Sequence, residues 1–225
     1  MQLAIKYQID WIRTRIVEQF EADWPKTIFE WRRQRGEWKA NLTSMAMRIE
    51  PLYPLEHFHA EPAAAIRFAL DFDIPSILPA AYYRLAMADL EEQWKDPEPV
   101  TLDPEGVSAR WGCLDAGILM RLMRGKERLM EKYFRISGDL RLSLGGRGCR
   151  SEGCRQKGRE LEEVMMTNWQ MNLRLKPDVL GILCSIWDRD QGVDVCVDCS
   201  IIMRRKIGEL LGEIWRELPD IFELR

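Results

Sequence analysis

The stretch CVDCSIIMRRKIGELLGEIWRELPDIF (residues 196–222) decides the fold class of this chain. Its apolar side chains recur at i, i+3, i+4, i+7 and i+11, which places them on one face of an α-helix. They are Ile207, Leu210, Leu211, Ile214 and Leu218. Few windows elsewhere show the strict alternation of a half-buried strand. The chain is therefore predicted to be all-α, with the helices arranged as an irregular bundle.

A second amphipathic helix precedes Pro25 at the other end of the chain. Its apolar face is made of Ile5, Ile9, Ile12, Ile16 and Phe20. Pro25 ends this helix, because the residue before a proline is pushed out of the α region, and suits the first turn of the next. From residue 36 to residue 60 the apolar spacing is poorer, and this segment is predicted to be mostly loop.

Residues 62–94 predict a helical hairpin. Pro62 opens a short helix, residues 73–76 form a turn, and Ser76 is expected to cap a second helix. The spacing predicts that the second helix buries Leu78, Ala81, Tyr82 and Leu85.

The C-terminal half is divided by proline and glycine. Three prolines within residues 95–106 predict a linker, and a helix capped near Asp115 is expected to follow. Residues 137–158 contain six glycines and no apolar period, so they are predicted to be a loop, with further helices near 161–169 and 180–187. We expect three regions: the N-terminal helices at 1–35, the hairpin region at 36–95 and a C-terminal helical region at 96–225.

Composition limits the class of protein. The chain has 225 residues, 46% of them hydrophobic and 31% charged, and a formal net charge of −3. This apolar content suffices for a core, so a disordered tail is excluded. No apolar run approaches the roughly 20 residues of a membrane span, and the first residues do not resemble a signal peptide. We therefore expect an intracellular protein, cytoplasmic or nuclear, with no membrane partner.

Four of the six cysteines form two closely spaced pairs, Cys149-x4-Cys154 and Cys196-x2-Cys199. Such spacing lets two thiolates from one backbone turn reach a single ion, and two such pairs complete a tetrahedral site. We predict a structural Zn²⁺ that cross-links the two cysteine pairs and thereby stabilises the C-terminal part. Four unrelated free thiols are the alternative, and a redox role for Cys196-x2-Cys199 lacks the βαβ context of thioredoxin-like proteins.

The segment 147–159 is locally basic. Nucleic acid attracts such a cluster, but no aromatic residue interleaves with the charges to stack on a base. A solvated basic face is the favoured interpretation, and a zinc-stabilised nucleic-acid- or chromatin-associated module is the alternative. The basic residues are Arg147, Arg150, Arg155, Lys157 and Arg159, against the single acidic residue Glu152.

The sequence lacks the common signatures of catalytic sites, such as a phosphate-binding glycine loop, a nucleophile elbow or an H-E-x-x-H helix. Cys113 and Cys184 are interpreted as small core residues. His57 and His59, in a proline-flanked loop, are interpreted as surface residues. We therefore expect a non-enzymatic protein with no catalytic residue and no cofactor-binding residue besides the four zinc ligands.

Five phrases of the sequence carry a resemblance to a known family. They are LAIKYQID (3–10), EADWP (21–25), EPAAAI (61–66), DIPSILPAAYYR (73–84) and IWRELPDIF (214–222), the last preceded by the C-x2-C pair. The first two resemble the closing helices of a BTB domain. The others look like the region after that domain in a large family of BTB-domain-containing proteins of basidiomycete fungi, and their order and distances agree over most of the chain.

The resemblance implies a module for protein–protein interaction, of the type used by ubiquitin-ligase adaptors, with unidentified protein partners. In the family, the BTB sheet and its dimer-forming helices would precede residue 1, so we expect either a gene product whose sequence starts earlier than this one or a truncated form that keeps only the last BTB helices. The oligomeric state stays open. Without a BTB core, the first helix is expected to pack loosely, mainly through residues near Trp24 and Trp31.

Overall fold

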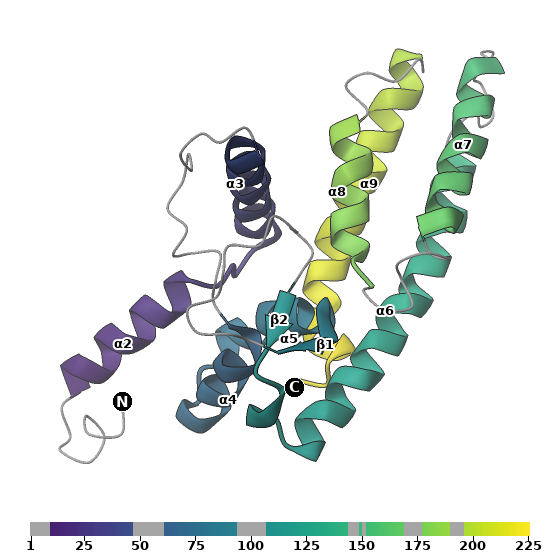
Figure 1. Ribbon diagram of the computed structural model, residues 1–225. Coiled ribbons are helices and arrows are strands. Elements are labelled where there is room, and N and C mark those ends of the chain that lie inside the picture. The colour runs from purple at the N-terminus through teal and green to yellow at the C-terminus, as the bar shows by residue number, and fades with distance from the viewer. Residues whose placement is uncertain are drawn as a thin grey trace. The chain divides into compact units, whose positions relative to one another are not determined.

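The computed structural model describes residues 10–46, 61–93, 107–143, 149, 152–168, 177–189 and 196–225. Helices dominate these residues, so the predicted all-α class is confirmed. In chain order the elements are α2 (Asp10–Ala22), α3 (Ile28–Ala46), α4 (Pro62–Phe72), the 3-10 turn η2 (Pro75–Ile77), α5 (Leu78–Ala86), β1 (Ala88–Gln93), β2 (Val107–Ala109), the 3-10 turn η3 (Trp111–Cys113), α6 (Ala116–Ser143), α7 (Glu152–Asn168), α8 (Val179–Arg189) and α9 (Val197–Ile221) (Figure 1).

One short pair of parallel strands, β1 and β2, interrupts the helices. Ala88 lies opposite Val107 and Gln93 lies opposite Ala109, with an irregular register between them. The sequence did not reveal this pair because a three-residue strand is too short to show alternation. The predicted linker at residues 95–106 lies outside the described residues.

The chain forms two compact units, which divide between residues 119 and 120, within α6. The three regions expected from the sequence stay a prediction. Within the described ranges of either unit, no helix has the combined length and apolar character that a membrane crossing requires.

Helices α4 and α5 of the first unit form the predicted hairpin (Figure 1). It ends at Ala86, so the prediction that it extends to residue 94 is wrong, because residues 88–93 form strand β1. Pro62 occupies the first turn of α4, and the Glu61 carboxylate accepts hydrogen bonds from the N–H groups of Ala63 at 2.9 Å and Ala64 at 2.6 Å. Asp73 ends α4 in the left-handed conformation, with φ of 55°. All four residues expected in the core of α5 are buried, namely Leu78, Ala81, Tyr82 and Leu85.

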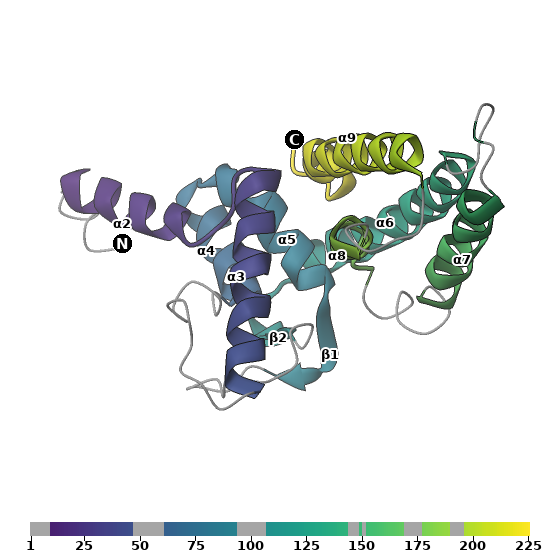
Figure 2. The ribbon, with the colours of Figure 1, turned by 90° about the horizontal axis from the view of Figure 1, so that it is seen from above.

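Aromatic contacts connect α2 and α3 to the hairpin. The rings of Phe20 on α2 and Phe68 on α4 have centroids 4.5 Å apart. Trp31 on α3 meets Tyr83 on α5 edge to face at 6.1 Å, and Figure 2 shows α3 running past α5. No described residue of α2 is buried, whereas Trp24, which follows it, is. This matches the loose packing expected of the first helix over residues 10–22, while Ile5 and Ile9 of its apolar face lie outside the described residues.

Two local predictions in this unit are wrong. The loop expected from Gly36 onward is helical as far as Ala46, because one glycine costs only about 1 kcal/mol in a helix and good helix formers follow it. Ser76 does not cap α5; its hydroxyl donates a hydrogen bond to the carboxylate of Glu21 instead. Hydrogen bonds from Lys26 and Ser76 hold the pKa of Glu21 below its ordinary value.

In the second unit, the apolar stripe of α9 is buried as predicted. Figure 1 shows α8 lying beside α9, which agrees with their mutual contacts. Lys132 on α6 binds two carboxylates of α9, those of Glu213 at 2.6 Å and Glu217 at 2.8 Å. The buried side chains of α9 are Cys199, Met203, Ile207, Leu210, Leu211, Ile214, Leu218 and Ile221.

The loop predicted over residues 137–158 is largely helical. Helix α6 continues to Ser143 and α7 begins at Glu152, while residues 144–148, 150 and 151 lie outside the described residues. Ile136 and Leu140 are buried and continue the helical stripe of Tyr133 at i+3 and i+7. The number of glycines obscured this period, and the helix continues through Gly138 because a single glycine costs a helix only about 1 kcal/mol.

Truncating the core of the hairpin is expected to destabilise the protein. Leu85 is completely buried, so Leu85→Ala should lower the free energy of unfolding by about 2–5 kcal/mol, through lost apolar burial and a residual cavity. Urea unfolding followed by circular dichroism measures the change. Leu70→Ala, at an exposed leucine of the same hairpin, is the matched control and should cost far less. Equal costs at the two positions would contradict the packing described here.

A close approach between α6 and the end of α9 gives a second stability prediction. A Cβ atom at Gly125 would lie 2.1 Å from Cδ1 of Phe222, which is closer than two carbon atoms can come. Gly125→Ala should therefore cost about 1–3 kcal/mol through overpacking, despite the better helix propensity of alanine.

The matched control is Gly138→Ala in the same helix, where nothing lies near the added atom. It should be neutral or stabilising by up to about 1 kcal/mol. Urea unfolding of both variants checks the pair, and a stabilising Gly125→Ala would show that Phe222 does not occupy this position.

Candidate metal centre

Two helix beginnings supply three of the four paired cysteines. Cys196 is the N-cap of α9, with extended backbone angles (φ −63°, ψ 155°), and Cys199 lies in the first turn of that helix. A residue just outside a helix and one three positions later face the same side, which is why C-x2-C suits a helix start. Cys154 lies near the beginning of α7, and Cys149 precedes α7 in the chain.

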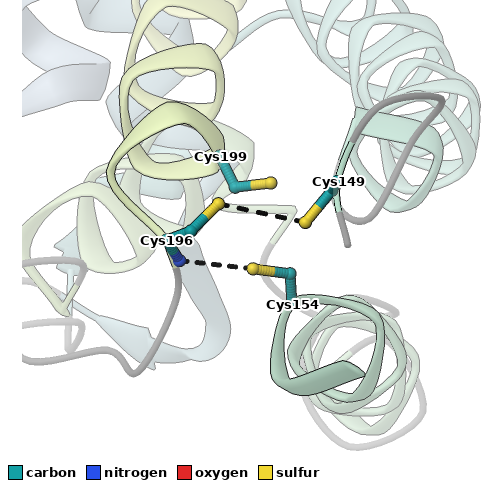
Figure 3. A group of neighbouring side chains, drawn as sticks. All are labelled: Cys149, Cys154, Cys196 and Cys199. Carbon is teal, nitrogen blue, oxygen red and sulfur yellow. Dashed lines mark hydrogen bonds between the residues drawn. The ribbon is translucent and has the colours of Figure 1, made fainter. Parts of the chain in front are cut away.

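The four side chains converge on one point (Figure 3). Their Sγ atoms all lie within 4.8 Å of one another. The Sγ atoms of Cys149 and Cys196 are 3.9 Å apart, and the backbone N–H of Cys196 donates a hydrogen bond to the Sγ of Cys154 at 3.2 Å. Because this bond joins the beginning of α9 to a residue of α7, it holds the two cysteine pairs in position.

The distances fit a single tetrahedral ion. Metal–sulfur bonds of about 2.3 Å with tetrahedral angles place sulfur atoms about 3.8 Å apart. The Cys149–Cys196 distance already matches this value, and the widest separation needs to contract by about 1 Å. Within the parts of the chain that the structure describes, this is the group of metal-ligating side chains that lies close enough to bind an ion.

Burial and local charge also suit a metal centre. Cys154 is completely buried and Cys199 is 3% exposed, while Cys149 and Cys196 are half-buried. The first turns of α7 and α9 present the positive ends of two helix dipoles to the cluster, which favours anionic sulfur. Four thiolate ligands leave no coordination position open for a substrate.

The structure brings together all four cysteines that the sequence nominated, so the possible metal site is confirmed as a cluster compatible with a metal. Sequence reasoning missed that Cys154 belongs to a helix and that the N–H of Cys196 reaches across to its sulfur. Both features depend on where the backbones of these two segments lie in space, and the spacing of the cysteines in the sequence does not reveal this.

The interpretations of the remaining candidate residues have different outcomes. Cys184 is buried in α8 as predicted, but Cys113 is exposed, so its interpretation as a core residue is wrong. It lies in the short turn η3, whose residues are exposed or half-buried, rather than on a helical stripe. His57 and His59 lie outside the described residues.

Comparison of this chain with known protein families, with curated proteins and with solved structures finds no match.

Removing two of the four sulfurs is expected to abolish metal binding. The purified chain should retain a metal ion after extensive dialysis, and the Cys196→Ser/Cys199→Ser variant should lose it, because two ligands cannot close a tetrahedral site. Elemental analysis by mass spectrometry measures the content. Cys113→Ser, at an exposed thiol outside the cluster, is the control and should bind metal normally. The same metal content in the parent and the double variant would exclude the cluster as the ligand set.

Proposed function

We propose that this chain is a non-enzymatic module for protein–protein interaction that is stabilised by a structural zinc ion. The observation that carries the proposal is the position of the four-cysteine cluster, at the beginning of a helix that then exposes apolar side chains to solvent. A closed metal centre supplies folding free energy rather than chemistry, so its natural role is to fix the structure around it.

Zinc is the ion that suits this donor set best. Four soft thiolates in tetrahedral arrangement are typical of structural Zn²⁺ sites and of iron–sulfur centres. Cysteine pairs separated by two to four residues are a common source of zinc ligands, and a cluster with two buried and two half-buried cysteines resembles a closed site. Zinc has no redox chemistry of its own, which agrees with a structural role.

The interaction surface that we propose is the apolar face of α9, defined as Val197, Ile201 and Ile202. Val197 is 74% exposed and Ile201 is 60% exposed, and Ile202 is exposed as well. Val197 and Ile201 are one helical turn apart, so their side chains are neighbours. Single exposed apolar residues are ordinary, but Val197 and Ile201 are neighbours on the helix surface, and Ile202 extends this exposed apolar surface about 100° around the helix. A protein partner can cover this surface beside the proposed metal site.

The pairing of the described basic side chains near the cluster favours protein–protein interaction rather than nucleic-acid binding. Arg155 and Arg159 pair with Glu152, at 3.4 Å and 3.6 Å, and Lys157 pairs with Glu160 at 2.6 Å. These carboxylates belong to the same helix and offset the positive charge that a phosphate backbone would need.

The more specific role, within ubiquitin-ligase adaptors of the fungal BTB type, rests on the sequence phrases that resemble the region after the BTB domain. An all-α unit with a metal staple and an exposed apolar patch is a suitable structure for recruiting a partner. We propose this role as the expected biological setting of the module.

The proposal is tested by disrupting the apolar face of α9. Ile201→Glu should weaken binding of a captured protein partner at least about tenfold, because burying an unpaired charge at an interface costs several kcal/mol. Zinc content and helicity should not change. Phe29→Glu, at an exposed aromatic residue of the other unit, is the control and should bind normally.

The dependence of binding on salt separates the proposal from its alternative. Capture of a protein through the apolar face should persist as salt is raised. Binding of nucleic acid that falls steeply with salt and survives in Ile201→Glu would instead support the module that uses the basic segment 147–159.

A further inference from the structure

The four cysteines of the cluster differ in how deeply each residue is buried. Cys154 and Cys199 are buried, and Cys154 also accepts the N–H of Cys196. Cys149 and Cys196 are half-buried. One half-buried cysteine therefore comes from each cysteine pair, and the sulfurs of these two residues lie 3.9 Å apart.

We propose that Cys149 and Cys196 form a peroxide-sensitive pair whose oxidation to a disulfide releases the zinc ion. The inference rests on the proposed zinc centre and adds a regulation to it. The spacing of the cysteines alone would favour a disulfide within Cys196-x2-Cys199. The structure favours a bond between the two pairs, because Cys199 is buried, whereas Cys149 is half-buried and its sulfur lies 3.9 Å from that of Cys196.

The chemistry requires hydrogen peroxide as the oxidant. The thiolate of one cysteine attacks a peroxide oxygen, so that an S–O bond forms, the O–O bond breaks and hydroxide leaves. The second thiolate attacks the resulting sulfenic acid, the S–S bond forms, the S–O bond breaks and a second hydroxide leaves. The two thiolates lose two electrons, and two protons from solvent convert the hydroxides to water.

The disulfide changes what holds this region together. The sulfurs of Cys154 and Cys199 remain as the only two ligands, and two ligands do not close a tetrahedral site, so the ion leaves and these two thiolates take up protons from solvent. The sulfurs of Cys149 and Cys196 must approach by about 2 Å to reach bonding distance. The covalent bond would then tether the same two segments that the metal tethered, so oxidation would exchange one cross-link for another.

Titration of the zinc-loaded chain with hydrogen peroxide tests the inference. A chromogenic zinc chelator follows release of the ion, and peptide mapping without reduction locates the disulfide. Trypsin separates Cys149 from Cys154 by cleaving after Arg150, and cleavage before Asp198 separates Cys196 from Cys199, so every pairing gives a distinct fragment.

We expect zinc release to follow formation of a cross-linked fragment containing Cys149 and Cys196, and a reductant with added zinc should reverse both. Cys149→Ser should lose this fragment, whereas the control Cys113→Ser should form it normally. Retention of zinc, or its release with a bond inside either cysteine pair, would overturn the inference and leave the zinc centre standing. A chain that holds no zinc before peroxide is added would overturn the centre itself and the switch with it.

Discussion

The convergence of four sulfur atoms is the constraint on which the second unit depends. The hydrogen-bonded residues Cys154 and Cys196 are 42 positions apart in the chain. Closing a loop of that length costs conformational entropy, and the cost grows only slowly with length. The contacts between α8 and α9 help to bring the chain back, and the N–H of Cys196 completes the approach. The beginnings of α7 and α9 are therefore fixed by the same few atoms.

The first unit is stabilised in a different way. Its hairpin has a capped first helix, a left-handed turn residue at Asp73 and a set of fully buried side chains. Aromatic rings on α2 and α3 add contacts at its surface. None of these features involves the cysteine cluster, so loss of a metal should leave the hairpin folded, as local units with their own apolar core can remain stable.

Apolar periodicity made much of this structure predictable. The stripe of α9 and the buried residues of α5 follow directly from the 3.6-residue repeat, and the cysteine spacing identified the cluster. The predictions failed where local composition and tertiary contacts disagree. The glycines at residues 138 and 153 suggested a loop, although buried Ile136 and Leu140 continue the stripe of α6. The short strands β1 and β2 form because they pair with each other, and the sequence of neither segment predicts a strand by itself.

The close approach of Phe222 to Gly125 has a consequence for the length of α9. The ring of Phe222 fills the space where a side chain at position 125 would lie, while Cys199 anchors the opposite end of the same helix in the cluster. An inserted or deleted residue between these anchors would rotate one end by about 100° and shift it by about 1.5 Å. Substitutions along the helix can be accommodated one at a time, but a change in the number of residues would misalign one anchor. The spacing between Cys199 and Phe222 should therefore vary less among homologous chains than the residues within it.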